Sequence, residues 1–70
     1  MPEDPREVVA KNVMKLREKA NYSREELSDL IGASHSYVFQ VEVRRKMPSL
    51  LMGLRLAKVL GVTPEGLLAK

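Results

Sequence analysis

A short stretch of the chain carries side chains that can contact DNA bases, and three cations follow it. The candidate base-reading residues are His35, Ser36, Phe39 and Gln40. A glutamine can make paired hydrogen bonds to the major-groove edge of adenine, a serine can bond to several bases, and an apolar ring can touch the thymine methyl group. The run Arg44-Arg45-Lys46 would meet the phosphates that flank those bases. The pattern favours binding to double-stranded DNA.

Simpler structural explanations exist for each feature on its own. Phe39 and Val43 could belong to a protein–protein interface or to a wider core, and the cationic run to a solvated loop. A histidine such as His35 is more often a surface or capping residue than a base contact. Ser34 is first of all a helix cap, with a phosphate contact as its second role. The DNA interpretation is favoured because all these features occur together.

A helix that starts at Ser34 and runs to about Val43 would gather the base-reading groups on one face. At about 100° per residue, Val38 and Val41 share the buried side, with Tyr37 and Glu42 beside it. The opposite side holds His35 at its edge, then Ser36, Phe39, Gln40 and Val43. A solvated helix face usually carries charged residues, and this one carries none. We therefore expect that face to meet another surface.

The preceding helix is predicted from a capping box formed by Ser23 and Glu26. Its apolar stripe is Leu27, Leu30 and Ile31. Gly32 ends it, so that the turn Gly32-Ala33-Ser34 joins it to the next helix. Two short helices around a tight turn that contains glycine form the helix-turn-helix pattern.

Three further helices are expected around this pair, with no sheet. The first begins at an Asp4 cap with Pro5 at its first position, and Asn21 closes it in the left-handed conformation. Its buried face is Val9, Val13, Leu16 and Ala20. The fourth helix follows a Ser49 cap, and its apolar face is Leu50, Leu51, Leu54, Ala57 and Leu60. Thr63-Pro64-Glu65 starts a short fifth helix with Leu67 and Leu68.

Length and composition restrict the classes of function. Seventy residues with a net charge of +3 form one domain, residues 1–70, in which residues 1–4 are a flexible N-terminus. The chain has no cysteine and one histidine, so we expect neither a metal site nor a cofactor. No catalytic arrangement of side chains stands out, and an enzyme is improbable. A cytoplasmic protein, associated with the nucleoid when bound to DNA, is the default expectation.

The chain resembles the Cro/lambda-repressor helix-turn-helix family, the Xre type. The resemblance is carried by residues 22–28 (YSREELS), residues 31–38 (IGASHSYV), Val41-Glu42, residues 48–50 (PSL) and residues 56–62 (LAKVLGV). It extends over about residues 9–68 and implies a compact five-helix domain that binds operator DNA as a symmetric homodimer. It also implies a structural ion pair between Arg17 and Glu42.

The resemblance assigns roles to the residues already singled out. It makes His35, Ser36, Phe39 and Gln40 the base-reading positions, and it makes Arg24, Arg44, Arg45 and Lys46 phosphate contacts, in addition to the secondary phosphate contact of Ser34 noted above. The chain departs from the family at Arg24, where glutamine is usual, and at Arg44, where glycine is usual. An arginine in the left-handed conformation at position 44 would cost about 1 kcal/mol. Otherwise the third helix would run on by one or two residues.

Two classes of function remain open. The first is a sequence-specific transcriptional regulator, and we favour a repressor, although the residues themselves do not distinguish it from an activator that touches RNA polymerase or a partner protein. Its dimer contacts would be Val62, Leu67 and Leu68. The second is a protein-interaction module, such as an antitoxin-type partner-binding protein. Its docking patch would be Phe39, Val43, Met47 and Met52.

Overall fold

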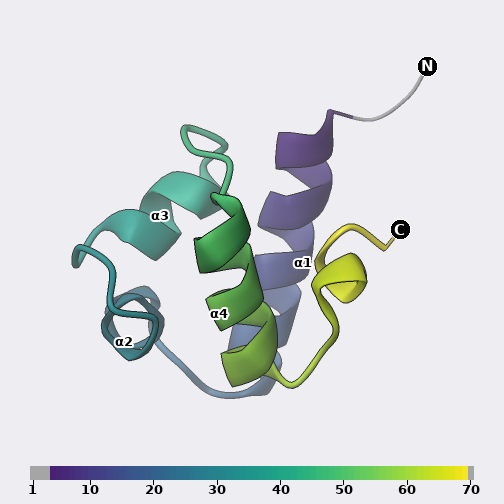
Figure 1. The fold of residues 1–70 in the computed structure, drawn as a ribbon. Coiled ribbons are helices and arrows are strands. Elements are labelled where there is room, and N and C mark those ends of the chain that lie inside the picture. Colours follow the sequence, from purple (N-terminus) through teal and green to yellow (C-terminus); the bar gives the residue numbers. More distant parts are fainter. Residues whose placement is uncertain (1–3, 70) are drawn as a thin grey trace.

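Four α-helices and one 3-10 turn build residues 4–69, the part of the chain that the computed structural model describes (Figure 1). They are α1 (Pro5–Lys19), α2 (Arg24–Leu30), α3 (Tyr37–Glu42), α4 (Leu50–Leu60) and η1 (Pro64–Leu67). The predicted all-α class is confirmed. Of the predicted flexible N-terminus, residues 1–3 lie outside the described residues.

The prediction of a fifth helix is wrong, because η1 is a single 3-10 turn. The Thr63 hydroxyl caps it by accepting a hydrogen bond from the Gly66 amide at 3.2 Å. Only four residues follow that cap inside the element, too few to nucleate an α-helix on their own. The Asn12 amide of α1 holds the turn in place, because its Nδ2 donates to the carbonyls of Leu67 and Ala69, each at 2.8 Å.

The helix α1 starts where the capping signal predicts. The Asp4 carboxylate accepts a hydrogen bond from the Arg6 amide at 2.9 Å, and Pro5 occupies the first position. Hydrogen bonds from the Arg6 side chain and amide lower the pKa of Asp4. Val9 and Val13 are buried as expected. Ala20 is exposed instead, since it lies beyond the last helical turn as the C-cap.

Left-handed residues close the first three helices, each just beyond the helical cap. Asn21, Gly32 and Arg44 have φ values of 62°, 72° and 66°. After α3, the Arg44 amide donates to the Val41 carbonyl at 3.1 Å and the Arg45 amide to the Gln40 carbonyl at 2.9 Å. These two bonds form a Schellman motif. Arg44 therefore keeps the left-handed geometry, at a cost of about 1 kcal/mol, and α3 does not run on.

The helix α3 begins two residues later than the sequence predicts, because its N-cap position is Ser36 rather than Ser34. Ser36 precedes it, but the Ser36 side chain does not cap its amides. A residue of α2 replaces that cap: the buried Ser28 hydroxyl accepts from the Val38 amide at 3.0 Å and donates to the Arg24 carbonyl at 2.8 Å. The two helices of the pair are therefore joined by a buried hydrogen bond as well as by apolar contact.

The core lies where α1 and α4 meet the helix pair. Figure 1 shows α2 and α3 on one side of the molecule and η1 on the other, with α1 and α4 between them. The core residues are Val9, Val13, Leu27, Ile31, Tyr37, Val38, Val41, Leu56, Ala57 and Leu67. No helix within residues 4–69 has the length and apolar character needed to cross a membrane.

The buried face of α4 differs from the prediction. Leu56 and Ala57 are buried and Leu60 is packed against the core, but Leu50, Leu51 and Leu54 are exposed. The helix is apolar on most of its circumference, so its pattern alone does not determine which leucines face inward. Three leucines of α4 consequently lie on the surface.

Candidate nucleic-acid interface

The helix α3 presents the face that the sequence predicts. Val38 and Val41 are fully buried, and Tyr37 and Glu42 are buried beside them. The outward residues are His35, Ser36, Phe39 and Val43, all exposed, and Gln40, which is half-buried. The exposed face of α3 therefore carries hydroxyl, amide, aromatic and aliphatic groups without a formal charge.

Two of the predicted base-reading side chains are already joined to each other. The Gln40 Nε2 donates a hydrogen bond of 2.9 Å to the Ser36 Oγ, one helical turn away. The bond restrains the Gln40 side chain, while one amide hydrogen and the Oε1 acceptor stay available. An amide with one free donor and one free acceptor still matches the N7 and N6 groups of adenine. Less rotamer entropy is then lost when DNA binds.

A buried carboxylate anchors the end of α3 to α1. The Glu42 side chain accepts hydrogen bonds from the Arg17 Nε at 2.7 Å and Nη2 at 3.3 Å. The remaining Arg17 nitrogen, Nη1, donates to the Tyr22 carbonyl at 2.9 Å. The hydrogen bond to Glu42 raises the pKa of Arg17, against the opposing effect of burial. The chain therefore contains an Arg17–Glu42 ion pair that fixes the orientation of α3.

Arg24 joins the same carboxylate from α2. Its Nε donates to the Glu42 Oε1 at 3.0 Å, and its guanidinium carbon lies 5.5 Å from the centre of the Phe39 ring. The Arg24 side chain is 41% exposed. Its charged head therefore lies over the outward face of α3, beside a predicted base-reading residue, and not along the flank of α2.

The other predicted phosphate-binding residues lie around both ends of α3. The Arg44 Nη2 is 3.6 Å from the Glu7 Oε1, and both side chains are about half exposed. The Lys46 ammonium lies 5.4 Å from the centre of the Tyr37 ring. Arg45 and Ser34 are exposed. Three cations thus follow the C-terminal end of α3, and Arg24 lies over its uncharged face.

The acidic neighbour of His35 comes from α2. The His35 Nδ1 lies 3.8 Å from the Asp29 Oδ1, and both side chains are largely exposed. This contact is too long and too exposed to fix the imidazole strongly. His35 therefore stays available at the N-terminal edge of the α3 face.

The predicted dimer contacts do not share one surface. Leu67 fills the core and is 4% exposed, and Val62 packs against the same core. Leu68 is the exposed member of the set. The prediction for Leu67 is corrected for a physical reason: η1 turns that side chain inward against α1 and α4.

The docking patch of the alternative function is also divided. Met52 packs against the core, and Met47 lines an apolar groove together with Leu50 and Leu68. Phe39 and Val43 lie on α3 and the residue after it, and they do not line that groove.

Sequence reasoning missed Ser28, which connects α2 to the first turn of α3. The signal was a hydroxyl residue directly after Leu27, on the side of α2 that faces the core. A small polar residue on a buried face needs a hydrogen-bond partner, and the nearest unsatisfied donors are the first amides of the next helix.

Comparison with known proteins identifies the architecture. The family model described as Helix-turn-helix matches residues 13–67. The structure of the hypothetical transcription factor NHTF from Neisseria is 34% identical, with a TM-score of 0.90, and the match covers 99% of this chain and 82% of that one. The restriction-modification controller protein C.AhdI from Aeromonas hydrophila is 32% identical, with a TM-score of 0.82, over 89% of this chain and 94% of that one. None of the curated proteins is significantly similar. The chain belongs to the helix-turn-helix family of DNA-binding transcription regulators.

Proposed function

We propose that the protein is a sequence-specific regulator, a repressor, that reads double-stranded DNA with α3 in the major groove. The observation that carries the proposal is the exposed and uncharged face of α3, which has Arg24 over Phe39 and three cations just after its C-terminal end. In this arrangement α2 crosses the DNA backbone while the outward residues of α3 reach base edges. Occupancy of the site would then block RNA polymerase.

The base contacts come from four side chains: His35, Ser36, Phe39 and Gln40. Ser36 and Gln40 act as a unit because they share a hydrogen bond. The Gln40 amide has a donor for the adenine N7 and an acceptor for the adenine N6 amino group. Phe39 offers an apolar surface for a thymine methyl group. The sequence preference is therefore expected to centre on A·T pairs at these positions.

Ser34, Arg44, Arg45 and Lys46 contact the phosphates in this proposal. The exposed Arg44–Glu7 pair is no obstacle, since exposed ion pairs contribute about 0–1 kcal/mol and a phosphate can replace the carboxylate. Arg45 and Lys46 lie directly after the Schellman turn, whose hydrogen bonds fix their backbone amides against the Gln40 carbonyl. The turn thus holds Arg45 and Lys46 next to the C-terminal end of the exposed face of α3.

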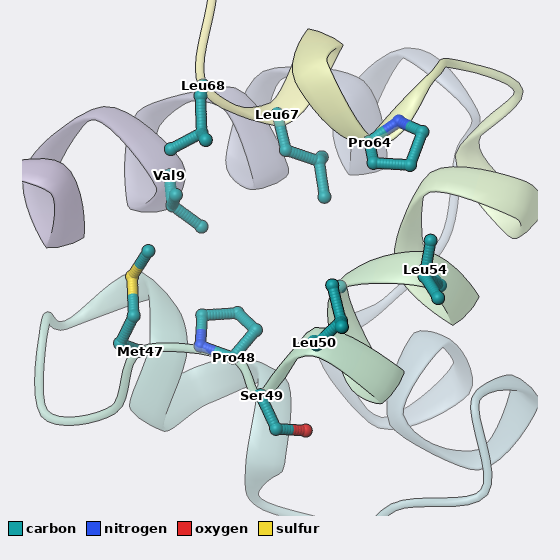
Figure 2. A pocket seen from close by; sticks show the side chains of 10 residues that line it. Val9, Met47, Pro48, Ser49, Leu50, Leu54, Pro64, Leu67 and Leu68 are labelled. Atoms are coloured by element: carbon teal, nitrogen blue, oxygen red, sulfur yellow. The ribbon is translucent and has the colours of Figure 1, made fainter.

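The homodimer is proposed to form through an apolar groove away from α3. The groove has a volume of about 160 Å³ and is lined by residues of the α3–α4 loop, α4, η1 and α1. Figure 2 shows Val9, Leu67 and Leu68 on one side of it, and Met47, Pro48 and Leu50 on the other. Leu50 is 81% exposed and Leu68 52% exposed. A second copy would cover these leucines in a self-complementary, two-fold contact.

A two-fold dimer of this kind makes a prediction about the DNA. Its two α3 helices would lie in successive major grooves, so the half-sites should be related by symmetry and be about 34 Å apart. The exposed Leu50 takes the place of Val62, which does not line the groove, and Leu67 lines the groove from the core. Leu68 is retained from the prediction made on the sequence.

Selection of bound duplexes from a randomised pool tests the function. We expect enrichment of an inverted repeat with half-sites about 10 base pairs apart. Affinity for the enriched duplex should fall about 1,000-fold between 50 and 200 mM salt if about six phosphates are contacted. A pool that yields no enriched sequence, with affinity that hardly responds to salt, would contradict the proposal and favour the protein-interaction module.

Sedimentation of single variants tests the dimer. Leu50→Gln should shift the chain toward the monomer without loss of helical content, because that side chain has almost no contact with the core. Leu30→Gln is the matched control, since Leu30 is exposed on α2 and does not line the groove. Equal association constants for the two variants would refute the assignment of the groove.

A further inference from the structure

Arg24 is restrained at two points of its guanidinium group. The Nε edge is bound to the buried Glu42 carboxylate at 3.0 Å, and the guanidinium carbon lies over the Phe39 ring, 5.5 Å from its centre. Glu42 is itself held by Arg17, so it cannot follow a movement of Arg24. The hydrogen bond to Glu42 and the cation–π contact with Phe39 together restrain the orientation of the Arg24 guanidinium.

The outer edge of that guanidinium is left free. Within residues 4–69, neither Arg24 Nη1 nor Nη2 donates a hydrogen bond to another residue, and the side chain is 41% exposed. The two Nη groups form the end-on fork of the guanidinium, which has the spacing of two parallel acceptors. Phe39 beneath it lies on the face of α3 that the proposed function places in the major groove.

We propose that Arg24 is a specificity-determining residue that reads a guanine, beside the base pair contacted by Phe39. This inference rests on the proposed function. Guanine presents O6 and N7 to the major groove as two adjacent acceptors, and a bidentate arginine is their most common partner in proteins. Phe39 has two roles in this arrangement: it supports the guanidinium from below and offers its exposed edge to a thymine methyl group.

The restraints on Arg24 favour a base edge over a phosphate. A phosphate contact needs only a charge within reach, and the exposed Arg45 and Lys46 after α3 already supply such charges. The Arg24 guanidinium lies over Phe39 on the exposed face of α3. Its orientation is restrained by the Glu42 carboxylate, whose side chain is 1% exposed. Glu42 is shared by Arg17 and Arg24, so the cluster of three side chains keeps one net positive charge for the acceptors of guanine.

The matched pair Arg24→Lys and Arg45→Lys tests the inference. Each change keeps the positive charge and removes the fork, which a lysine cannot form. Both variants and the unchanged chain are used to select duplexes from the same randomised pool, and their thermal unfolding is compared by circular dichroism. Phe39→Leu is a third variant, which removes the ring under Arg24 and keeps an apolar side chain.

Arg24→Lys should lose the preference for guanine at one position of each half-site, by roughly 5- to 150-fold, while the other positions and the salt dependence stay unchanged. Phe39→Leu should weaken the same guanine preference, and Arg45→Lys should change no base preference. An Arg24→Lys variant that keeps every base preference of the unchanged chain would overturn the inference and leave the proposed function intact. If the unchanged chain enriches no sequence, the proposed function itself fails.

Discussion

Replacement of Glu42 by glutamine should destabilise the fold more than any other conservative change on α3. The Glu42 residue is 4% exposed and accepts three hydrogen bonds, two from Arg17 and one from Arg24. The substitution Glu42→Gln keeps the size of the side chain and removes its charge. Arg17 is then a buried cation without its counter-ion.

The size of the effect follows from these contacts. Removal of one partner from a buried ion pair costs about 3–5 kcal/mol. The lower end applies here, because Arg17 keeps its bond to the Tyr22 carbonyl and the new amide oxygen still accepts one hydrogen bond. A 70-residue domain has about 3.5–10 kcal/mol of stability in total. A loss of about 3 kcal/mol therefore corresponds to a Tm lower by roughly 12–24 °C.

Urea denaturation followed by circular dichroism measures this loss. Glu18→Gln is the matched control, since Glu18 is an exposed residue of α1 and its replacement should change the free energy of unfolding by less than about 0.5 kcal/mol. The double variant Arg17→Met with Glu42→Leu should be more stable than Glu42→Gln alone, because no buried charge is left without a partner. A Glu42→Gln variant within about 1 kcal/mol of the unchanged chain would refute the role of this carboxylate.

Four other predictions concern two glycines and the proposed DNA interface. Gly32→Ala should destabilise the fold by about 1–2 kcal/mol, because the φ of Gly32 is +72° and an added Cβ would meet the Arg55 Nη1 at 3.3 Å. Gly53→Ala should stabilise the fold by about 0.5–1 kcal/mol, since no atom lies within 4 Å of an added Cβ. Urea denaturation of the two variants measures both changes in the free energy of unfolding. In fluorescence-anisotropy titrations, Gln40→Ala should cost about 1–3 kcal/mol on the selected duplex and relax the preference at one base pair, and an equal loss on unrelated duplexes would contradict the base contact. Arg45→Ala should weaken all duplexes alike and reduce the salt slope by about one, and a sequence-selective loss would contradict the phosphate contact.

Local signals in the sequence were sufficient for much of the fold. The caps Asp4, Ser23 and Ser49 place the starts of α1, α2 and α4 where the structure has them. The inward and outward faces of α3 were also predictable, since Val38 and Val41 recur at the spacing of one helical face and both are buried. These predictions depend on interactions between residues one or two helical turns apart, and the sequence pattern of a single segment is enough to recognise them.

Features that depend on contacts between helices were not predictable. The start of α3 depends on Ser28, ten residues earlier in the chain, and not on the nearer Ser34. The place of Arg24 depends on Glu42 and Phe39, which only the packing of α2 against α3 brings within reach. The inward side of α4 was misjudged for a related reason: leucines occupy both sides, and tertiary contacts decide which side is buried.

The six-residue α3 cannot hold its own orientation, because an isolated helix of this length is not stable in water. Its N-terminal turn is held by Ser28 of α2, and its C-terminal turn by Glu42, which binds Arg17 of α1 and Arg24 of α2. Both anchors are buried, and Glu42 lies beside the proposed DNA contact because it binds Arg24, which lies over Phe39. Precise placement of base-reading groups requires such supporting contacts. A change at Ser28 or Glu42 should therefore reduce base discrimination even where enough stability remains for the chain to fold, since the reading face would be present and misoriented.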